Sequence, residues 1–317
     1  MGTRWRVCVV AQENCTLDVL HAAIQATLDR VVRQMSTWEH ASDICLYNQA
    51  EAGTWHTLQD DFQAVIQCAL DIARKSDGAY DPSIGPLVEL WGFGAKGVRD
   101  PLAPMPPRTA IESARARVDW KRILVRKSPT TDPRMQILQA GRIGLDLSAI
   151  AKGYGVDVVA GRLRDLGIRA ALVDVGGELY GYGCKPDGDH WRVQVETASD
   201  EEPEDQPCII VLDGCAVATS GDRWHHFMHD DQRYAHTIDP RSGHPVDNAP
   251  SCVTVVAHTA MLADAWATAM TVMGVEDGLQ FARTHSLAVR FMTKCADGVS
   301  IQTTTSFDEL CVGSEPA

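Results

Sequence analysis

Residues 253–274 read VTVVAHTAMLADAWATAMTVMG, and this stretch decides the fold of the chain. Its first five residues are mostly β-branched and apolar, which is typical of a buried strand over residues 253–257. The strand leads into a helix that begins near Thr259 and ends at Gly274, because glycine commonly closes helices. A shorter helix is expected over residues 276–284. The stretch therefore predicts a strand joined almost directly to a helix.

Four further helices are expected in the first half of the chain. The first has apolar residues at three- and four-residue spacing, with Thr16 placed to cap it. The second carries Asp60 and Gln63 at the spacing of a capping box. The four segments cover residues 17–35, 62–76, 108–117 and 146–167. The last of them begins as an irregular turn at Asp146, continues as a helix and stops at Gly167.

Short alternating or apolar segments predict strands between the helix blocks. They lie at residues 123–125, 135–138, 172–175, 191–195, 208–212, 215–219, 287–292 and 299–303. Asp213-Gly214 is a strong hairpin signal and predicts that the two strands beside it pair with each other. Because the strands cluster without strict alternation with helices, we expect an α+β fold. It forms a single domain over residues 1–317, with the acidic segment 197–207 as a surface excursion.

Composition excludes several classes of protein. The 317 residues carry a formal net charge of −13, so the long-range field repels nucleic acid and no nucleic-acid partner is expected. No apolar run is long enough for a transmembrane segment. We expect a soluble protein, cytoplasmic as the sequence stands and periplasmic if an export leader has been removed. Ten dispersed cysteines without a Cys-x-x-Cys pair favour buried reduced thiols over disulfides or a zinc site.

Asp264 and Thr268 are four residues apart on the predicted helix 259–273, so they share one face. A carboxylate and a hydroxyl suit Mg²⁺, which takes few protein ligands and completes its shell with water and phosphate oxygens. A back-bonded threonine beside a solvated aspartate explains the same spacing. Both interpretations stay open at this point.

Two glycine-containing stretches are candidate binding loops. Glycine and proline interrupt residues 78–97, which predicts a binding loop or a packed loop. Residues 146–155 read DLSAIAKGYG and open a helix with an acid, a hydroxyl and Lys152, an arrangement that can hold a phosphate. They lack P-loop spacing, and an ordinary helix start with Lys152 in water remains an alternative. Gly176-Gly177 does not complete a dinucleotide-binding fingerprint.

Histidines occur in two places. His236 stands three residues before Asp239 in a loop fixed by proline and glycine, so it could act as a general base. A turn in which Asp239 bonds its own backbone is the alternative. His225, His226 and His229 suggest a metal cluster, but acidic neighbours and the absence of a third ligand type favour polar surface histidines.

The order of these signals resembles one family, the ApbE-type FAD:protein FMN transferases, over nearly the whole chain. Ser242 stands where threonine is usual in that family, and Trp38 stands where tyrosine is frequent. The eight blocks that carry the resemblance are residues 1–3, 35–38, 78–94, 146–153, 175–177, 219–222, 236–243 and 263–269.

The resemblance implies an α+β fold similar to T-fold architecture, with FAD in a cleft between two halves. It also implies a role for individual side chains, with His236 as the catalytic histidine. The residues that would contact the flavin nucleotide are Met1, Trp38, Ala79, Tyr80 and Asp81, with Asp146, Lys152 and Ile238 completing its site. The residues that would hold Mg²⁺ are Asp264, Thr268 and, through its backbone carbonyl, Ala149.

The activity implied is a Mg²⁺-dependent transfer of FMN from FAD to a threonine or serine hydroxyl of an acceptor flavoprotein, with release of AMP. Two alternatives use parts of the same site. An FAD pyrophosphatase would release free FMN and AMP, and a flavin-binding carrier would bind without turnover.

Overall fold

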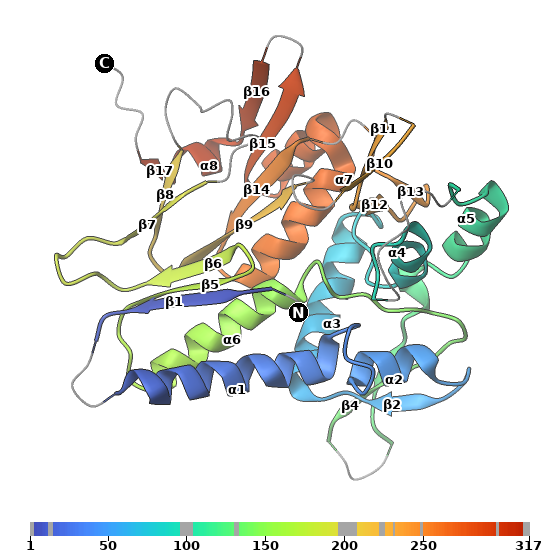
Figure 1. The fold of residues 1–317 in the computed structure, drawn as a ribbon, viewed down its shortest axis with the longest axis horizontal. Coiled ribbons are helices and arrows are strands. Elements are labelled where there is room, and N and C mark those ends of the chain that lie inside the picture. The colour runs from blue at the N-terminus through green and yellow to red at the C-terminus, as the bar shows by residue number, and fades with distance from the viewer. Residues whose placement is uncertain are drawn as a thin grey trace. The chain divides into compact units, whose positions relative to one another are not determined.

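The computed structural model describes residues 3–11, 15–95, 104–129, 133–195, 208–221, 226–230, 232–247, 250–295 and 298–312. The chain divides into two compact units, each assembled from separate stretches of sequence. Unit 1 comprises residues 1–2, 29–151 and 225–247, and unit 2 comprises residues 3–28, 152–224 and 248–317. Both units combine helices with sheets, so the predicted α+β class is confirmed (Figure 1).

Unit 2 is built on a seven-stranded antiparallel sheet of order β1-β5-β6-β9-β14-β15-β16. The strand predicted at 253–257 is β14, which lies between β9 and β15 and is buried along nearly its whole length. Val255 pairs with Ala218 on one side and Val289 on the other. The strands are β1 (Trp5–Val9), β5 (Ala171–Val175), β6 (Glu178–Tyr182), β9 (Cys215–Gly221), β14 (Cys252–Ala257), β15 (Ala288–Cys295) and β16 (Gly298–Thr303).

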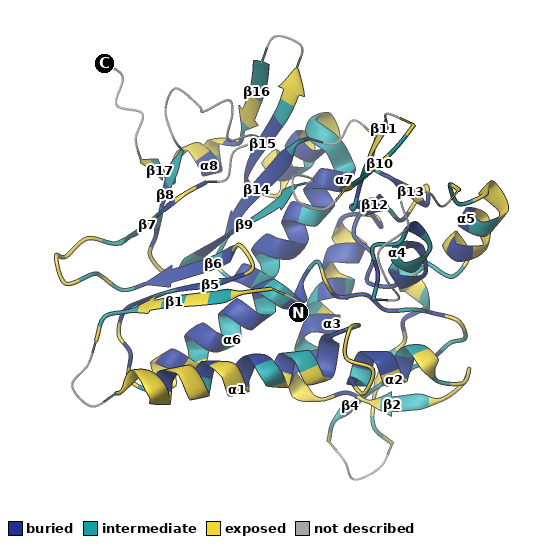
Figure 2. Ribbon diagram, in the orientation of Figure 1, coloured by how far each residue is buried: buried dark blue, intermediate teal, exposed yellow. Residues whose placement is uncertain are grey.

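Helices cover one face of this sheet. Helix α7 (Ala260–Thr284) packs on β9 and β14, and its inner face is buried (Figure 2). It is interrupted at Gly274, which has φ 77° and ψ −178°, so the predicted pair of helices with a break at this glycine is confirmed. Helix α6 (Ala151–Asp165) contacts β6, where Arg164 Nη2 donates 2.8 Å to the Tyr180 hydroxyl.

A small sheet of order β17-β8-β7 lies on the opposite face, and it corrects one prediction. Gly181 on β6 comes so close to Leu212 on β8 that a Cβ added to the glycine would lie 2.6 Å from the leucine Cβ. The predicted hairpin through Asp213-Gly214 is wrong, because β8 pairs with β7 and β17 while β9 pairs with β6 and β14. The turn exists, but Ile210 and Leu212 bury their side chains between the two sheets, and this packing outweighs the local turn signal. The elements are β7 (Trp191–Gln194), β8 (Ile209–Leu212), α8 (Thr305–Asp308) and β17 (Cys311–Val312).

Unit 1 combines short helices with a three-stranded sheet of order β2-β4-β3 and two small hairpins. Helix α1 (Leu17–Met35), predicted to its end residues, begins in unit 2 and ends in unit 1. The other elements are α2 (Asp43–Gln49), β2 (Trp55–Thr57), α3 (Asp60–Lys75), α4 (Gly85–Trp91), α5 (Arg108–Arg115), the 3₁₀ turn Trp120–Arg122, β3 (Val125–Lys127), β4 (Met135–Leu138), β10 (His226–His229), β11 (Gln232–Ala235), β12 (Ile238–Asp239) and β13 (His244–Pro245).

The start of α3 differs from the sequence prediction. Asp60 does not form a capping box with Gln63, because the residue before the helix is Gln59 and its side chain makes no capping hydrogen bond. The helix is instead anchored from α1, where the Gln34 Oε1 accepts 2.9 Å from Phe62 N. Asp61 accepts from Gln34 Nε2 at 3.1 Å and from Arg30 Nε at 2.6 Å. Tertiary contacts therefore replace the local cap.

The described helices include none that is both long and apolar enough to cross a membrane. The ten cysteines all lie within the described residues, and none of them forms a disulfide. The predicted acidic excursion at 197–207 lies outside the described residues, as does His225.

Candidate active site

The junction between α6 and α7 in unit 2 brings two helix starts into direct contact. A Cβ added to Gly153 would lie 2.1 Å from the backbone oxygen of Ala260, so only glycine allows this approach. Asp157, one turn further along α6, accepts from Ala260 N at 2.8 Å and from Met261 N at 2.9 Å. These are N–H groups that the start of α7 leaves without helical partners. Burial raises the pKa of Asp157 to about 6, against the effect of those two donors.

Asp264 lies on α7 at this junction and is not solvated, since it is only 5% exposed. Its Oδ2 accepts from Gly153 N at 3.0 Å. Burial raises the pKa of Asp264, whereas Lys152 and the Gly153 N–H lower it. Thr268 follows one turn later and is half-buried. Thr271 donates its hydroxyl to Ala267 O at 2.8 Å, but no such back-bond is found for Thr268 within the described part of the chain.

Lys152 links Asp264 to a third charged residue, Glu178 on β6. The Lys152 Nζ donates to Glu178 Oε1 and lies 3.7 Å from Asp264 Oδ1. The Glu178 side chain is 3% exposed and the Lys152 side chain is 30% exposed. Burial opposes the charged lysine, yet Asp264 and Glu178 together raise its pKa, so the ammonium stays protonated. Burial also raises the pKa of Glu178, with Lys152 acting in the opposite direction. The alternative of Lys152 in open water is therefore wrong.

Sequence reasoning missed Glu178, although a signal for it exists. Gly176 and Gly177 have φ 72° and 102°, and they form the two-residue turn of the β5–β6 hairpin, in which Val175 pairs with Glu178. Glu178 follows this turn and is the first residue of the otherwise mostly apolar strand ELYGY. An acidic residue in that position predicts a buried carboxylate. Buried charges are kept when they are paired, and this one faces Lys152.

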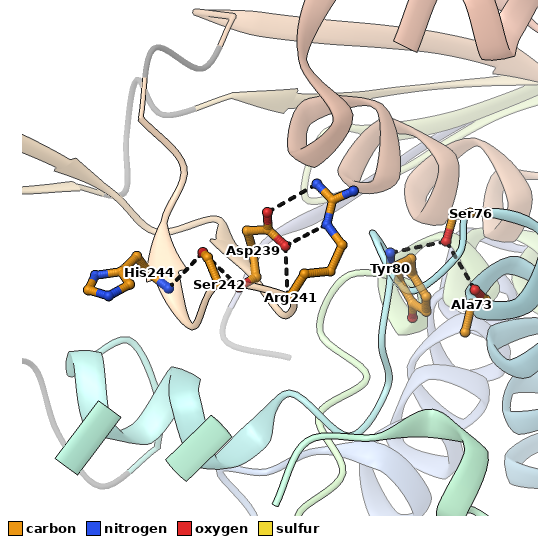
Figure 3. A network of polar contacts seen from close by, with 7 residues as sticks. All are labelled: Ala73, Ser76, Tyr80, Asp239, Arg241, Ser242 and His244. Atoms are coloured by element: carbon orange, nitrogen blue, oxygen red, sulfur yellow. Dashed lines mark hydrogen bonds and ion pairs between the residues drawn. The ribbon is translucent and has the colours of Figure 1, made fainter. Parts of the chain in front are cut away.

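In unit 1 the loop after α3 is fixed by its own backbone. Gly78 has φ 77° and donates its N–H to Ala73 O at 2.9 Å. The Tyr80 N–H donates to Ser76 Oγ at 3.1 Å (Figure 3). Ala79 and Tyr80 are buried. The stretch is a packed loop at this point, and it continues into α4, a short helix that the sequence analysis did not predict.

Asp81 in this loop has its carboxylate fully engaged. Its Oδ1 accepts from Ser83 N at 2.8 Å and from Ser83 Oγ at 2.6 Å, and its Oδ2 accepts from Trp120 N at 3.1 Å. Burial raises the pKa of Asp81, and the three donors oppose that change. The side chain therefore holds the loop together, and a contact to a nucleotide would fall to the backbone around it.

The segment that carries Asp146 runs beside this loop. Asp146 N donates to Pro82 O at 2.9 Å, and Gly85 N donates to Gly144 O at 3.1 Å. The Asp146 Oδ1 accepts from Ser148 N at 2.8 Å and so shapes the turn before α6. Unit 1 thus brings together four of the residues predicted to contact the flavin nucleotide, Ala79, Tyr80, Asp81 and Asp146.

The loop that carries His236 also belongs to unit 1. The His236 ring packs edge-on against Phe93, with 6.3 Å between ring centroids and an interplanar angle of 71°. Ile238 is 4% exposed within an apolar cluster with Leu87 and Trp91. The predicted turn at Asp239 is confirmed, because its Oδ1 accepts from Arg241 N at 2.8 Å (Figure 3).

The remaining predicted residues are spread over both units. Trp38 is 59% exposed in unit 1, and Ala149 is half-buried in unit 1. Lys152, Asp264 and Thr268 belong to unit 2, while Met1 lies outside the described residues. His226 and His229 are on strand β10, and His226 is exposed.

The described residues contain no group of three or more His, Cys, Asp or Glu side chains arranged to hold a metal ion. A magnesium site does not require one, since Mg²⁺ is commonly bound by one or two carboxylates together with water and substrate phosphates. The donors at the junction are oxygens, the Asp264 carboxylate and the Thr268 hydroxyl. These two oxygens fit a hard divalent cation. The buried Glu178 Oε2 has no hydrogen-bond partner among the described residues.

Comparison with known proteins identifies relatives of this chain. A model described as the ApbE family matches residues 1–291. The chain belongs to the ApbE family. Two curated relatives are named FAD:protein FMN transferase. The one from Klebsiella pneumoniae (strain 342) is 33% identical, covering 99% of this chain and 88% of that protein. The one from Escherichia coli (strain K12) is 31% identical with the same coverage.

Solved structures of ApbE proteins share the fold. The flavinyl transferase ApbE of Pseudomonas stutzeri, in its apo form, has a TM-score of 0.86 at 34% identity, covering 96% of this chain and 92% of that chain. The flavin transferase ApbE from Vibrio cholerae has a TM-score of 0.86 at 32% identity, covering 98% and 96%. The family resemblance predicted from the eight sequence blocks is confirmed.

Proposed function

We propose that this ApbE-family chain is a magnesium-dependent FAD:protein FMN transferase. It moves FMN from FAD to a threonine or serine hydroxyl of an acceptor flavoprotein and releases AMP. One observation carries the proposal: Asp264 is a buried carboxylate whose Oδ2 is held by the Gly153 N–H and whose Oδ1 lies 3.7 Å from a lysine ammonium. Burying a carboxylate and an ammonium together costs desolvation free energy. Such a group is typical of a functional site, and its charges suit a dianionic diphosphate with its cation.

Asp264, Thr268 and the backbone carbonyl of Ala149 are the residues that would hold Mg²⁺. When bound, this ion neutralises negative charge on the diphosphate of FAD and on the departing AMP. A cation is needed because a chain with net charge −13 offers the diphosphate little attraction of its own. Lys152 supplies a second positive charge at the same junction, which could attract a phosphate oxygen.

His236 would accept the proton of the acceptor hydroxyl. The hydroxyl oxygen forms a bond to the phosphorus of the FMN half, and the phosphoanhydride bond to AMP breaks. The product is a phosphoester on the acceptor. The packed loop of Ala79, Tyr80 and Asp81, together with Asp146, Ile238, Met1 and the exposed Trp38, would bind the flavin nucleotide.

Hydrolysis of FAD to FMN and AMP is the second candidate function, since water can take the place of the acceptor hydroxyl. A flavin carrier without turnover leaves the buried Asp264, Lys152 and Glu178 without a use. The experiment incubates the protein with FAD, Mg²⁺ and a candidate acceptor flavoprotein. AMP together with flavin that stays on the denatured acceptor supports transfer. Free FMN with an unlabelled acceptor supports hydrolysis, and no AMP supports the carrier.

A further inference from the structure

The ammonium of Lys152 is shared unequally between two buried carboxylates. It is in hydrogen-bond contact with Glu178 Oε1, whereas its distance to Asp264 Oδ1 is 3.7 Å. That second distance is beyond hydrogen-bond range. Asp264 is 5% exposed and the Glu178 side chain is 3% exposed, so neither charge is screened well by water. Lys152 is thus drawn to the side of Glu178.

This inequality matters for a cation that binds Asp264. An ammonium bonded directly to Asp264 would neutralise the carboxylate and repel a divalent ion at the same place. We propose that Glu178 is a positioning residue that holds the Lys152 ammonium off Asp264 and so keeps that carboxylate open to a divalent cation. The inference rests on the proposed function, because it takes Asp264 as a cation ligand.

The backbone around Glu178 fits a fixed anchor. The residue is the first of β6, directly after the tight turn at Gly176-Gly177, and it pairs with Val175 across the hairpin. The turn is held in addition by Gly177 N, which donates to Asp174 Oδ1 at 3.1 Å. On the other side, Gly153 N fixes the Asp264 carboxylate at 3.0 Å. Both carboxylates are therefore placed by rigid elements, and the flexible lysine is the group whose position Glu178 decides.

The test measures Mn²⁺ binding to the flavin-free protein at pH 7.5 by electron paramagnetic resonance of unbound Mn²⁺. Four proteins are compared: wild type, Glu178→Gln, Lys152→Met and the double variant. Glu178→Gln keeps the size of the side chain but loses the charge that anchors Lys152, so we expect about tenfold weaker Mn²⁺ binding. Lys152→Met removes the competing ammonium and should bind Mn²⁺ at least as well as wild type.

The double variant decides between positioning and direct ligation. If Glu178 acts through Lys152, Glu178→Gln has little effect once the lysine is gone, and the double variant binds within about threefold of Lys152→Met. If Glu178→Gln weakens binding by the same factor in both backgrounds, Glu178 is a ligand and the proposal is wrong. Unchanged binding in the single Glu178→Gln variant also overturns it.

Two controls keep the outcome interpretable. Asp187→Asn, in the turn between β6 and β7, removes one exposed carboxylate of unit 2 and should leave Mn²⁺ affinity unchanged within about twofold. Thermal melting of each variant checks folding, and Glu178→Asp, which shortens the anchor but keeps its charge, replaces Glu178→Gln if that protein does not fold. Wild-type protein that binds no Mn²⁺ would instead refute the cation site of the proposed function.

Discussion

Asp81 in unit 1 and Asp264 in unit 2 are both buried aspartates, 7% and 5% exposed, yet they are used differently. Asp81 receives three donors from Ser83 and Trp120, so its two oxygens are occupied by the loop that contains it. Asp264 receives one N–H, from Gly153, and its other oxygen faces the Lys152 ammonium at 3.7 Å. The first carboxylate holds its own loop together, and we propose that the second is available to a ligand. Two aspartates of similar burial therefore differ in the number of donors that they receive.

The largest effect is expected from Asp264→Ala. Metal-dependent AMP release should fall by at least about a thousandfold, because the carboxylate proposed to hold the cation is gone. The unpaired Gly153 N–H should lower the free energy of unfolding by about 1–3 kcal/mol, which leaves the protein folded. Steady-state AMP release and urea unfolding measure the two effects. AMP release at the wild-type rate would remove Asp264 from the site.

His236→Ala should affect a later step than the loss of Asp264. Flavin transfer to the acceptor should fall about 10²- to 10⁴-fold, the usual contribution of a general base, while Mn²⁺ affinity stays within about threefold of wild type. Labelled acceptor is measured in a single turnover. The matched control is His226→Ala, since this histidine is exposed on β10 and should be neutral. Equal transfer rates for the two variants would contradict the role of His236.

Asp81→Ala should lower stability without weakening cation binding. Its loss leaves three donors without an acceptor, two of them buried, so the free energy of unfolding in urea should fall by about 2–4 kcal/mol. Mn²⁺ affinity of the folded variant should be unchanged. Asp71→Ala, which removes an exposed carboxylate on α3 with an i,i+3 ion pair to Arg74, should cost less than about 0.5 kcal/mol. Weaker cation binding in Asp81→Ala would contradict the proposal that Asp264, and not Asp81, serves the cation site.

The smallest effect concerns pH and Asp157. Burial raises the pKa of Asp157 to about 6 in the folded chain, above the value of about 3.9 for an unfolded aspartate. The folded state then binds this proton more tightly, so the free energy of unfolding falls as pH rises from about 4 to about 6. Relative to Asp157→Asn, wild type should lose roughly 1–3 kcal/mol across that window. Parallel stability profiles for the two proteins would show that the pKa of Asp157 is not raised.

The sequence predicted what periodicity and local order determine. The helix 17–35, the strand before α7 and the break at Gly274 follow from apolar spacing and glycine positions, and the structure reproduces them. Strand pairing was harder, because the Asp213-Gly214 turn does not reveal that β8 packs on the far face of the sheet through Leu212. Helix and strand positions follow from local geometry, whereas strand pairing depends on how side chains from distant segments are buried together.

The candidate site shows the same division. Order along the chain was enough to select Asp264 and Lys152, and the structure places them 3.7 Å apart. Glu178 was not predicted, because its role depends on a hairpin that brings its side chain into contact with Lys152. The two residues are 26 positions apart in the sequence. Asp81 was predicted as a nucleotide contact, and only its hydrogen bonds reveal a structural use for its side chain.

Asp264 and Thr268 are proposed to hold a divalent cation near the start of α7. The most direct test is an anomalous difference map from crystals grown with FAD and Mn²⁺. We predict a strong peak about 2.1–2.2 Å from an Asp264 carboxylate oxygen and within coordination distance of the Thr268 hydroxyl, with the FAD diphosphate on its open side. A map with no peak at this junction, while FAD is bound elsewhere on the chain, would contradict the account.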